Sequence, residues 1–257
     1  MNKKELIQKI TSKKEFSKLP RKDVEKVLSK FESERYIDEE KVKLTRDLLR
    51  KVFSGFTSQK LLNLKNRDAD WVLKKHLSTR ERFSYYKELY SKLLKNFANK
   101  NVSIIDLGCG VNGFSYDFFP NKSKIKYVGV EAVGQLVELI NKYFKDNNLE
   151  GKVIHGSLFE LAKLKELISK VKKPKVVFLF KTLDSLEMLE KDYSKKLLKE
   201  IVPFVDKVVV SFATRSMVSR KKFNVSRKWI VDFINEDFKL IDNFNLGSER
   251  YIVFEER

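Results

Sequence analysis

The 257-residue chain has one cysteine, two histidines and no long apolar run. Cys109 has no partner for an internal disulfide, and His76 and His155 are too far apart to suggest a metal-ligand cluster, so we expect no metal site. No stretch approaches the ~18 consecutive apolar residues of a membrane-spanning helix, and residues 1–4 lack the apolar segment of a signal peptide. Repeats, heptads and low-complexity linkers are also missing. These absences predict a cytoplasmic protein that makes no membrane contact.

Acidic residues are too few to balance the basic ones, because 54 lysines and arginines face 35 aspartates and glutamates, for a net charge of +19. The excess is uneven, with +13 in residues 1–100 and +6 in residues 101–257. A concentrated basic region is typical of proteins that bind nucleic acid. The alternative is a lysine-rich solvated surface that binds nothing.

The most informative stretch is residues 102–113, VSIIDLGCGVNG. A short apolar run, typical of a buried parallel strand, ends at Asp106, and Gly108, Gly110 and Gly113 follow. Glycine permits a sharp turn and lets a ligand approach the backbone. We expect a ligand crevice at the carboxyl end of this strand.

Asp106 distinguishes two interpretations of this turn. The glycine spacing matches the dinucleotide fingerprint, but a pyrophosphate would not favour a carboxylate two residues before the first glycine. A cofactor with a cationic amino-acid end would favour a carboxylate at that position. The motif therefore resembles the first motif of class I S-adenosylmethionine (SAM) methyltransferases. A nicotinamide enzyme and a turn without a ligand remain alternatives.

The chain divides into two parts by periodicity. Residues 1–100 read as helices, including a long one over 79–97, and form an all-helical basic domain. From residue 102 onward strands alternate with helices, which predicts an α/β fold with a parallel sheet in residues 101–257, closed by an antiparallel hairpin. This is the seven-stranded, Rossmann-like arrangement of class I SAM methyltransferases. The predicted strands are 102–105, 125–130, 153–155, 175–180, 207–211, 238–244 and 250–255, and the predicted helices between them are 133–144, 158–171, 186–201 and 226–233.

Several side chains could hold a nucleoside cofactor at this edge. Glu131 ends the second predicted strand 18 residues after Gly113, where a carboxylate can accept both ribose hydroxyls. Ser157 and Leu158 follow the third strand, and Phe180 ends the fourth, so Leu158 and Phe180 could flank the adenine. An arginine of the basic run HLSTRER, residues 76–82, could fork onto a carboxylate. An ordinary capped helix start also explains that run.

Four motifs in order resemble one family. HLSTRER, DLGCGVN (106–112), FLFKTLDSLE (178–187) and VSFATRS (210–216) are similar to the aminoglycoside-resistance 16S ribosomal RNA (guanine-N7) methyltransferases, the Arm/Rmt group. The likeness runs in register from about residue 56 to residue 253, while the first 50 residues match only in basic, helical character.

The resemblance implies roles for particular residues. Lys181 and Arg215 would face the target nucleotide as catalytic residues, and Arg220 and Lys221 would contact RNA. Three departures leave the target nucleotide less fixed than the cofactor: Ser157 stands where an aspartate is expected, Asp184 replaces a proline, and 217–219 replaces a glycine-rich turn. The implied SAM pocket comprises Phe56, His76, Leu77, Ser78, Arg82, Asp106, Gly108, Gly110, Glu131, Ser157, Leu158 and Phe180.

The function implied is SAM-dependent methylation of guanine N7 in the decoding A-site of 16S rRNA, within the small (30S) ribosomal subunit. We expect a monomer whose basic N-terminal domain grips rRNA phosphates. Two alternatives stay open. One is a SAM methyltransferase acting on another RNA position, a protein or a small molecule, and the other is a non-catalytic RNA-binding protein with a vestigial cofactor pocket.

Overall fold

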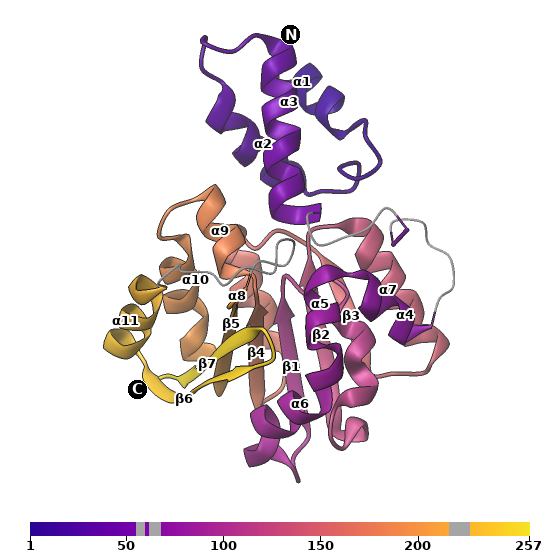
Figure 1. Ribbon diagram of the computed structural model, residues 1–257, viewed down its shortest axis with the longest axis vertical. Helices are drawn as coiled ribbons and strands as arrows, with labels where there is room; N and C mark the ends of the chain where they lie inside the picture. Colours follow the sequence, from indigo (N-terminus) through magenta and orange to yellow (C-terminus); the bar gives the residue numbers. More distant parts are fainter. Residues whose placement is uncertain (55–59, 62–67, 216–226) are drawn as a thin grey trace.

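The computed structural model describes residues 1–54, 60–61, 68–215 and 227–257 (Figure 1). Of the residues singled out in the sequence, Phe56, Arg220 and Lys221 lie outside the described residues. Within the described ranges, no helix is long and apolar enough to cross a membrane.

One seven-stranded sheet forms the centre of the molecule, in the order β3-β2-β1-β4-β5-β7-β6 (Figure 1). The first five strands are parallel, and β7 runs antiparallel to both β5 and β6. The predicted α/β class, seven strands and closing hairpin are confirmed. The strands are β1 (Val102–Leu107), β2 (Ile125–Glu131), β3 (Gly151–His155), β4 (Lys175–Phe180), β5 (Lys207–Ala213), β6 (Lys239–Leu246) and β7 (Glu249–Glu255).

The strand order changes direction at β1. The chain first adds β2 and β3 on one side of β1 and then returns to place β4 on its other side. At such a switch point, the loops after neighbouring strands diverge and leave a crevice at the carboxyl ends. The Asp106 turn follows β1, so the topology puts that turn at the crevice.

The central strands are buried on both faces. Ile104 and Phe178 belong to one apolar core, and their neighbours Ile105 and Leu179 belong to the other. This explains why the strands read as continuous apolar runs rather than as alternating ones. Helices α4 (Ala69–Lys75), α6 (Tyr86–Leu94) and α7 (Gly134–Asp146) contribute to the first core, and the short α5 (Leu77–Arg82) lies between α4 and α6 in the chain. Helices α8 (Leu161–Lys170), α9 (Leu183–Leu189), α10 (Tyr193–Ile201) and α11 (Lys228–Asp237) contribute mainly to the second core.

A three-helix unit stands over the carboxyl ends of the parallel strands (Figure 1). It consists of α1 (Lys3–Thr11), α2 (Arg21–Leu28) and α3 (Asp38–Leu49), followed by a π-helical turn, Arg50–Ser54. It docks on the start of α7, where Gly134 N donates to Lys18 O at 3.1 Å and Gln135 Nε2 donates to Lys14 O at 2.7 Å. Helices α4 and α6, also within the predicted helical domain of residues 1–100, contribute to the apolar core beside the sheet; the sequence predicted such packing for the last helix of that domain.

Two predicted helices are interrupted. The helix expected over 79–97 is broken by a 3-10 turn, Phe83–Tyr85, and the one expected over 186–201 is split between α9 and α10. Asp192 adopts a left-handed conformation at the second break. The Glu187 carboxylate accepts from the backbone N–H groups of Asp192 at 2.7 Å and Ser194 at 2.8 Å. A side chain thus satisfies the first amides of α10 and stabilises the new helix start.

The contact at Gly134 gives the first prediction. A Cβ at this glycine would lie 2.8 Å from Lys18 Cβ and 3.1 Å from Lys18 O, so Gly134→Ala should push the three-helix unit away from α7. We expect a loss of about 1–2 kcal/mol in unfolding free energy and faster amide exchange in α1–α3. The matched control is Gly156→Ala, whose Cβ would meet only Val130 at 3.7 Å. Equal exchange protection of α1–α3 in both variants would show that this docking contact is not tight.

Candidate active site

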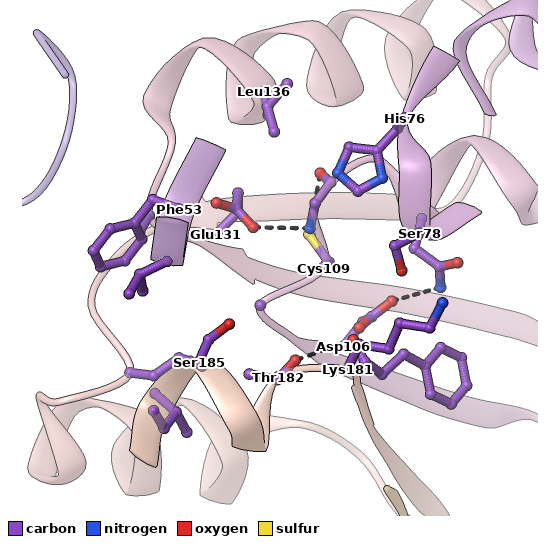
Figure 2. Close-up of a pocket in the computed structure, with 18 of the residues that line it drawn as sticks. Phe53, His76, Ser78, Asp106, Cys109, Glu131, Leu136, Lys181, Thr182 and Ser185 are labelled. Atoms are coloured by element: carbon purple, nitrogen blue, oxygen red, sulfur yellow. Dashed lines mark hydrogen bonds between the residues drawn. The ribbon is translucent and has the colours of Figure 1, made fainter. Parts of the chain in front are cut away.

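A cavity of about 860 Å³, counting its open mouth, lies at the carboxyl ends of the central strands, and Asp23 of the three-helix unit and Val52 and Phe53 of the turn that follows it line one part. Figure 2 shows Phe53 and Glu131 on one side of it and Ser78, Asp106 and Lys181 on the other. Most of the predicted cofactor residues in the described part of the chain line it: His76, Ser78, Arg82, Asp106, Gly108, Gly110, Glu131, Leu158 and Phe180. Leu77 and Ser157 are sequence neighbours of lining residues but are not themselves among the residues that line the cavity.

The turn after β1 requires glycine at two positions. Gly108 has φ +72° and Gly110 has φ +54°, a region that residues with a Cβ rarely adopt. A Cβ at Gly108 would lie 3.0 Å from Thr182 Cγ2, and one at Gly110 would lie 3.1 Å from His76 Cε1. The side chains of Thr182 and His76 therefore approach the glycine turn so closely that a Cβ would crowd them, and the backbone of the turn forms the floor of the cavity.

Asp106 presents a buried carboxylate to the cavity. Its Oδ2 accepts from Asn112 Nδ2 and from Tyr127 OH, each at 2.7 Å. Burial raises the pKa of Asp106 to about 6, although these two bonds partly stabilise the charged form. Since both bonds engage one oxygen, the group retains acceptor capacity for a cationic ligand.

Glu131 is the second buried carboxylate. It ends β2, and its two oxygens accept from Gly110 N and Val133 N, each at 2.8 Å. Burial raises the pKa of Glu131, while these backbone bonds lower it in part. The backbone thus fixes the carboxylate beside the glycine turn, where each oxygen can also accept a hydroxyl of a ribose.

A buried ion network joins α5 to the sheet. Arg82 Nε lies 3.0 and 3.2 Å from the two carboxylate oxygens of Glu249, on β7, and Lys181 Nζ lies 3.3 Å from the same carboxylate. Lys181 also pairs with Glu81, and Ser211 donates to Glu249. Burial alone would raise the pKa of Glu249, but the charges of Arg82 and Lys181 outweigh it and lower that pKa below its usual value.

The same network determines what Arg82 can reach. Its Nη2 donates to Ser78 Oγ at 2.7 Å and its Nη1 to Asn112 Oδ1 at 3.1 Å. The sequence predicted a cofactor-facing guanidinium. The guanidinium does line the cavity, with most of its donors engaged by protein groups. Lys181 and Arg82 are therefore charge-compensated before a ligand enters.

His76 lines the cavity as a neutral imidazole. Burial and the nearby charges of Arg82 and Lys181 lower its pKa to about 3. Cys109 is buried, which raises the pKa of its thiol well above the usual value. Among the described residues, no group of three or more histidine, cysteine or acidic side chains could hold a metal ion.

Some lining residues were missed by the sequence analysis. Asn112, Thr182 and Ser185 lie within the quoted motifs 106–112 and 178–187, so their positions could have been suspected. Asp23 comes from α2 in the three-helix unit and accepts a hydrogen bond from Ser157 Oγ. An aspartate in the first turn of a helix is so common that no sequence pattern singled out Asp23.

The residues expected to face the substrate are only partly described. Arg215 is exposed, two residues after the end of β5. Lys181 is buried at the cavity wall, just after β4, in a left-handed conformation with φ +57°. Lys181 therefore belongs to the interior of the site and Arg215 to its outer surface.

Comparison with known proteins gives consistent matches. Residues 40–232 match the model of the family described as ribosomal RNA methyltransferase (FmrO). A 16S rRNA (guanine(1405)-N(7))-methyltransferase from Proteus mirabilis is 27% identical over 188 residues, which are 71% of this chain and 63% of that protein. The chain thus spans less than two thirds of this curated relative.

Solved structures show the same fold. The 16S rRNA methyltransferase RmtF, in complex with S-adenosyl-L-homocysteine, has a TM-score of 0.80 at 18% identity, with all of both chains covered. The 16S rRNA methylase RmtB has a TM-score of 0.79 at 18% identity, covering all of this chain and 99% of its own. At these identities the likeness concerns the fold, and it includes the helical N-terminal region as well as the sheet.

The buried network gives the second prediction. Glu249→Gln would leave Arg82 and Lys181 buried with one carboxylate fewer, so we expect a loss of about 3–5 kcal/mol in unfolding free energy, measured by urea denaturation. The control is Glu255→Gln, which breaks a more exposed pair with Lys239 and should cost at most about 1 kcal/mol. Similar losses in both variants would mean that Glu249 does not compensate the buried cations.

Proposed function

The chain belongs to the FmrO family of ribosomal RNA methyltransferases, and from this membership we propose that it transfers a methyl group from SAM to N7 of a guanine in 16S rRNA. The guanine would lie in the decoding A-site of the small ribosomal subunit. The observation that carries the proposal is the cavity beside the β1 turn, in which Asp106 and Glu131 are buried together.

The cavity residues fit the parts of SAM. Asp106 suits the ammonium of the methionine end, because it retains acceptor capacity beside the glycine turn. Glu131 suits the ribose hydroxyls. The apolar side chains of Leu136, Leu158 and Phe159 offer flat contact to a base. The carboxylate of the methionine end would be met by Ser78 and the remaining donor capacity of Arg82.

The electrostatics also favour SAM. Arg82 and Lys181 are paired with Glu249 and Glu81, so Asp23, Asp106 and Glu131 leave the cavity with an excess of negative charge. SAM carries a net charge of +1 and its demethylated product carries none. Coulomb attraction in a buried site therefore favours the cofactor over the product, which would help product release.

The chemistry requires positioning more than proton transfer. When bound, SAM supplies a methyl group activated by the positive sulfonium. Guanine N7 has a free lone pair at neutral pH, so the protein need not remove a proton from it. The work of the chain is to hold N7 in line with the methyl group and to exclude water. The neutral His76 and the compensated Lys181 keep the wall of the cavity free of uncompensated positive charge.

The RNA side would be formed by basic residues. Arg215, which is exposed, would hold the target strand together with Arg220 and Lys221, which lie outside the described residues, and Lys181 would contact the extruded base at the cavity wall. A guanine in a folded stem must leave its stack to reach a buried methyl group. The basic N-terminal residues would bind rRNA phosphates, which makes binding strongly dependent on salt. We place the enzyme in the cytoplasm as a monomer that acts on 30S subunits and supports aminoglycoside resistance.

The alternative with support is a SAM methyltransferase for another RNA position. The substitutions at Ser157, Asp184 and 217–219 favour it, because they alter surroundings of the cavity and the basic loop. Modification mapping decides between the two. Small subunits are incubated with the protein and SAM, and N7-methylguanine is located by borohydride–aniline cleavage. Cleavage at one A-site guanine supports the proposal. Methyl incorporation without that cleavage would point to another position, and no incorporation at all would contradict both.

Asp106 gives the third prediction. Asp106→Asn should weaken SAM binding by roughly 10- to 100-fold, since it removes a charged acceptor from the ammonium. Wild-type affinity should also fall as the pH drops below about 6, the pKa to which burial raises Asp106, because the protonated carboxyl no longer attracts the cation. Calorimetry measures both effects. Asp117→Asn, an exposed aspartate paired with Lys122, is the control. Unchanged affinity in the Asp106 variant would refute this assignment.

Arg215 gives the fourth prediction. Because Arg215 is exposed outside the cavity, Arg215→Ala should leave SAM affinity unchanged and lower methyl transfer to small subunits by about tenfold or more. The control is Arg257→Ala, at the end of the chain beside Phe238. If transfer survives in the Arg215 variant, the RNA does not cross this part of the surface.

A further inference from the structure

We propose that Asp23 binds the exocyclic amino group of the cofactor's adenine, so that the three-helix unit supplies the residue that recognises the base. The inference rests on the proposed function, since it takes SAM as the ligand. It adds a residue from helix α2, whereas the groups assigned above for the methionine end and the ribose come from the sheet and from helices packed on it.

Asp23 is buried against the sheet body rather than in the core of its own unit. Its exposed fraction is 1%, it lines the cavity, and it accepts a hydrogen bond from Ser157 Oγ, which follows β3. Ser157 Oγ in turn accepts from Phe159 N at 3.0 Å, so its single proton is directed at Asp23. The residue therefore joins α2 to the loop at the base end of the cavity.

Within the described part of the chain, no cation forms an ion pair with this carboxylate. Lys22 and Lys26, which flank it on α2, pair with Glu160 and Glu190 instead. Burial raises the pKa of Asp23 to about 6; the like charges of Glu160 and Glu131 add to this rise, while the Ser157 hydrogen bond and the charge of Lys26 oppose it. A buried carboxylate with one neutral donor is costly for the fold. Such a group is expected where a ligand completes its hydrogen bonds.

The place of Asp23 in the cavity matches the base. Asp106, near the end of β1, and Glu131, the last residue of β2, mark the methionine and ribose ends, and β3 lies beyond β2 in the sheet. A base attached to that ribose continues toward the loop after β3, between Leu136, Leu158 and Phe159. At this end Asp23 offers acceptor sites, and a carboxylate has about four in all. Adenine presents an amino group at its edge, and a carboxylate acceptor at this position would favour a base with that hydrogen-bond donor.

The assignment explains why Ser157 suffices after β3. Its hydroxyl does not replace the carboxylate but orients one that reaches the site from α2. The ion pair Lys22–Glu160 joins α2 to the same loop, and Lys26–Glu190 joins α2 to the end of α9. Cofactor binding and docking of the three-helix unit are then linked, because each favours the other.

The test compares two ligands by calorimetry: S-adenosylhomocysteine and S-inosylhomocysteine, in which a carbonyl oxygen replaces the amino group. Wild-type protein should prefer the adenine compound by about tenfold or more, since an acceptor facing the wrong group is left unpaired. The Asp23→Asn variant should bind S-adenosylhomocysteine about tenfold more weakly than wild type and should no longer prefer it to S-inosylhomocysteine. The double variant Asp23→Ser with Ser157→Asp, which moves the carboxylate to the other side of the hydrogen bond, should recover the preference for S-adenosylhomocysteine.

Two controls separate recognition from folding. Asparagine can still accept from Ser157, and removing a buried charge should keep the thermal midpoint of Asp23→Asn equal to the wild-type value or raise it. Glu25→Gln, on the exposed side of α2 in a pair with Arg21, should behave as wild type.

The outcomes are distinct. If wild type binds the adenine compound and Asp23→Asn keeps the same preference, at equal or uniformly weaker affinity, Asp23 is not the recognition residue and the proposed function stands. If wild type binds neither compound, the proposed function fails and this inference fails with it.

Discussion

The buried pairing of Arg82 with Glu249 is the constraint on which the rest of the site depends. It joins residues 167 positions apart in the sequence, one on α5 and one on the closing hairpin, at 3.0 Å and with almost no exposure. Because Lys181 and Ser211 share the same carboxylate, the network fixes the ends of β4, β5 and β7 relative to α5. It also neutralises both cations of the cavity wall, so that the remaining carboxylates determine the sign of its charge.

The three carboxylates that carry this negative charge lie in a defined order along the cavity. Asp106, Glu131 and Asp23 follow the order of the strands from β1 through β2 to the loop after β3, and each meets a different part of an extended cationic nucleoside in our account. Two of these carboxylates belong to the sheet. The third comes from the unit that stands over the sheet, so in our account the unit that we propose binds RNA also contributes to the cofactor site.

The sequence predicted those features that depend on neighbouring residues. The first strand, predicted over 102–105 and observed as Val102–Leu107, the glycine turn and Glu131 at the end of β2 could be predicted because periodicity and spacing specify them locally. The break in the helix expected over 79–97 could not be predicted, because Phe83, Tyr86 and Tyr90 keep a helical spacing through the 3-10 turn. The partners of Arg82 and the position of Asp23 arise from contacts across the fold, and no local pattern encodes them.

The most direct measurement is a crystal structure of the protein with S-adenosylhomocysteine. The account predicts a ribose hydrogen-bonded to Glu131, an ammonium within reach of Asp106, and the adenine amino group beside Asp23. A nucleoside bound elsewhere, or in this cavity with its base turned away from the loop after β3, would contradict it.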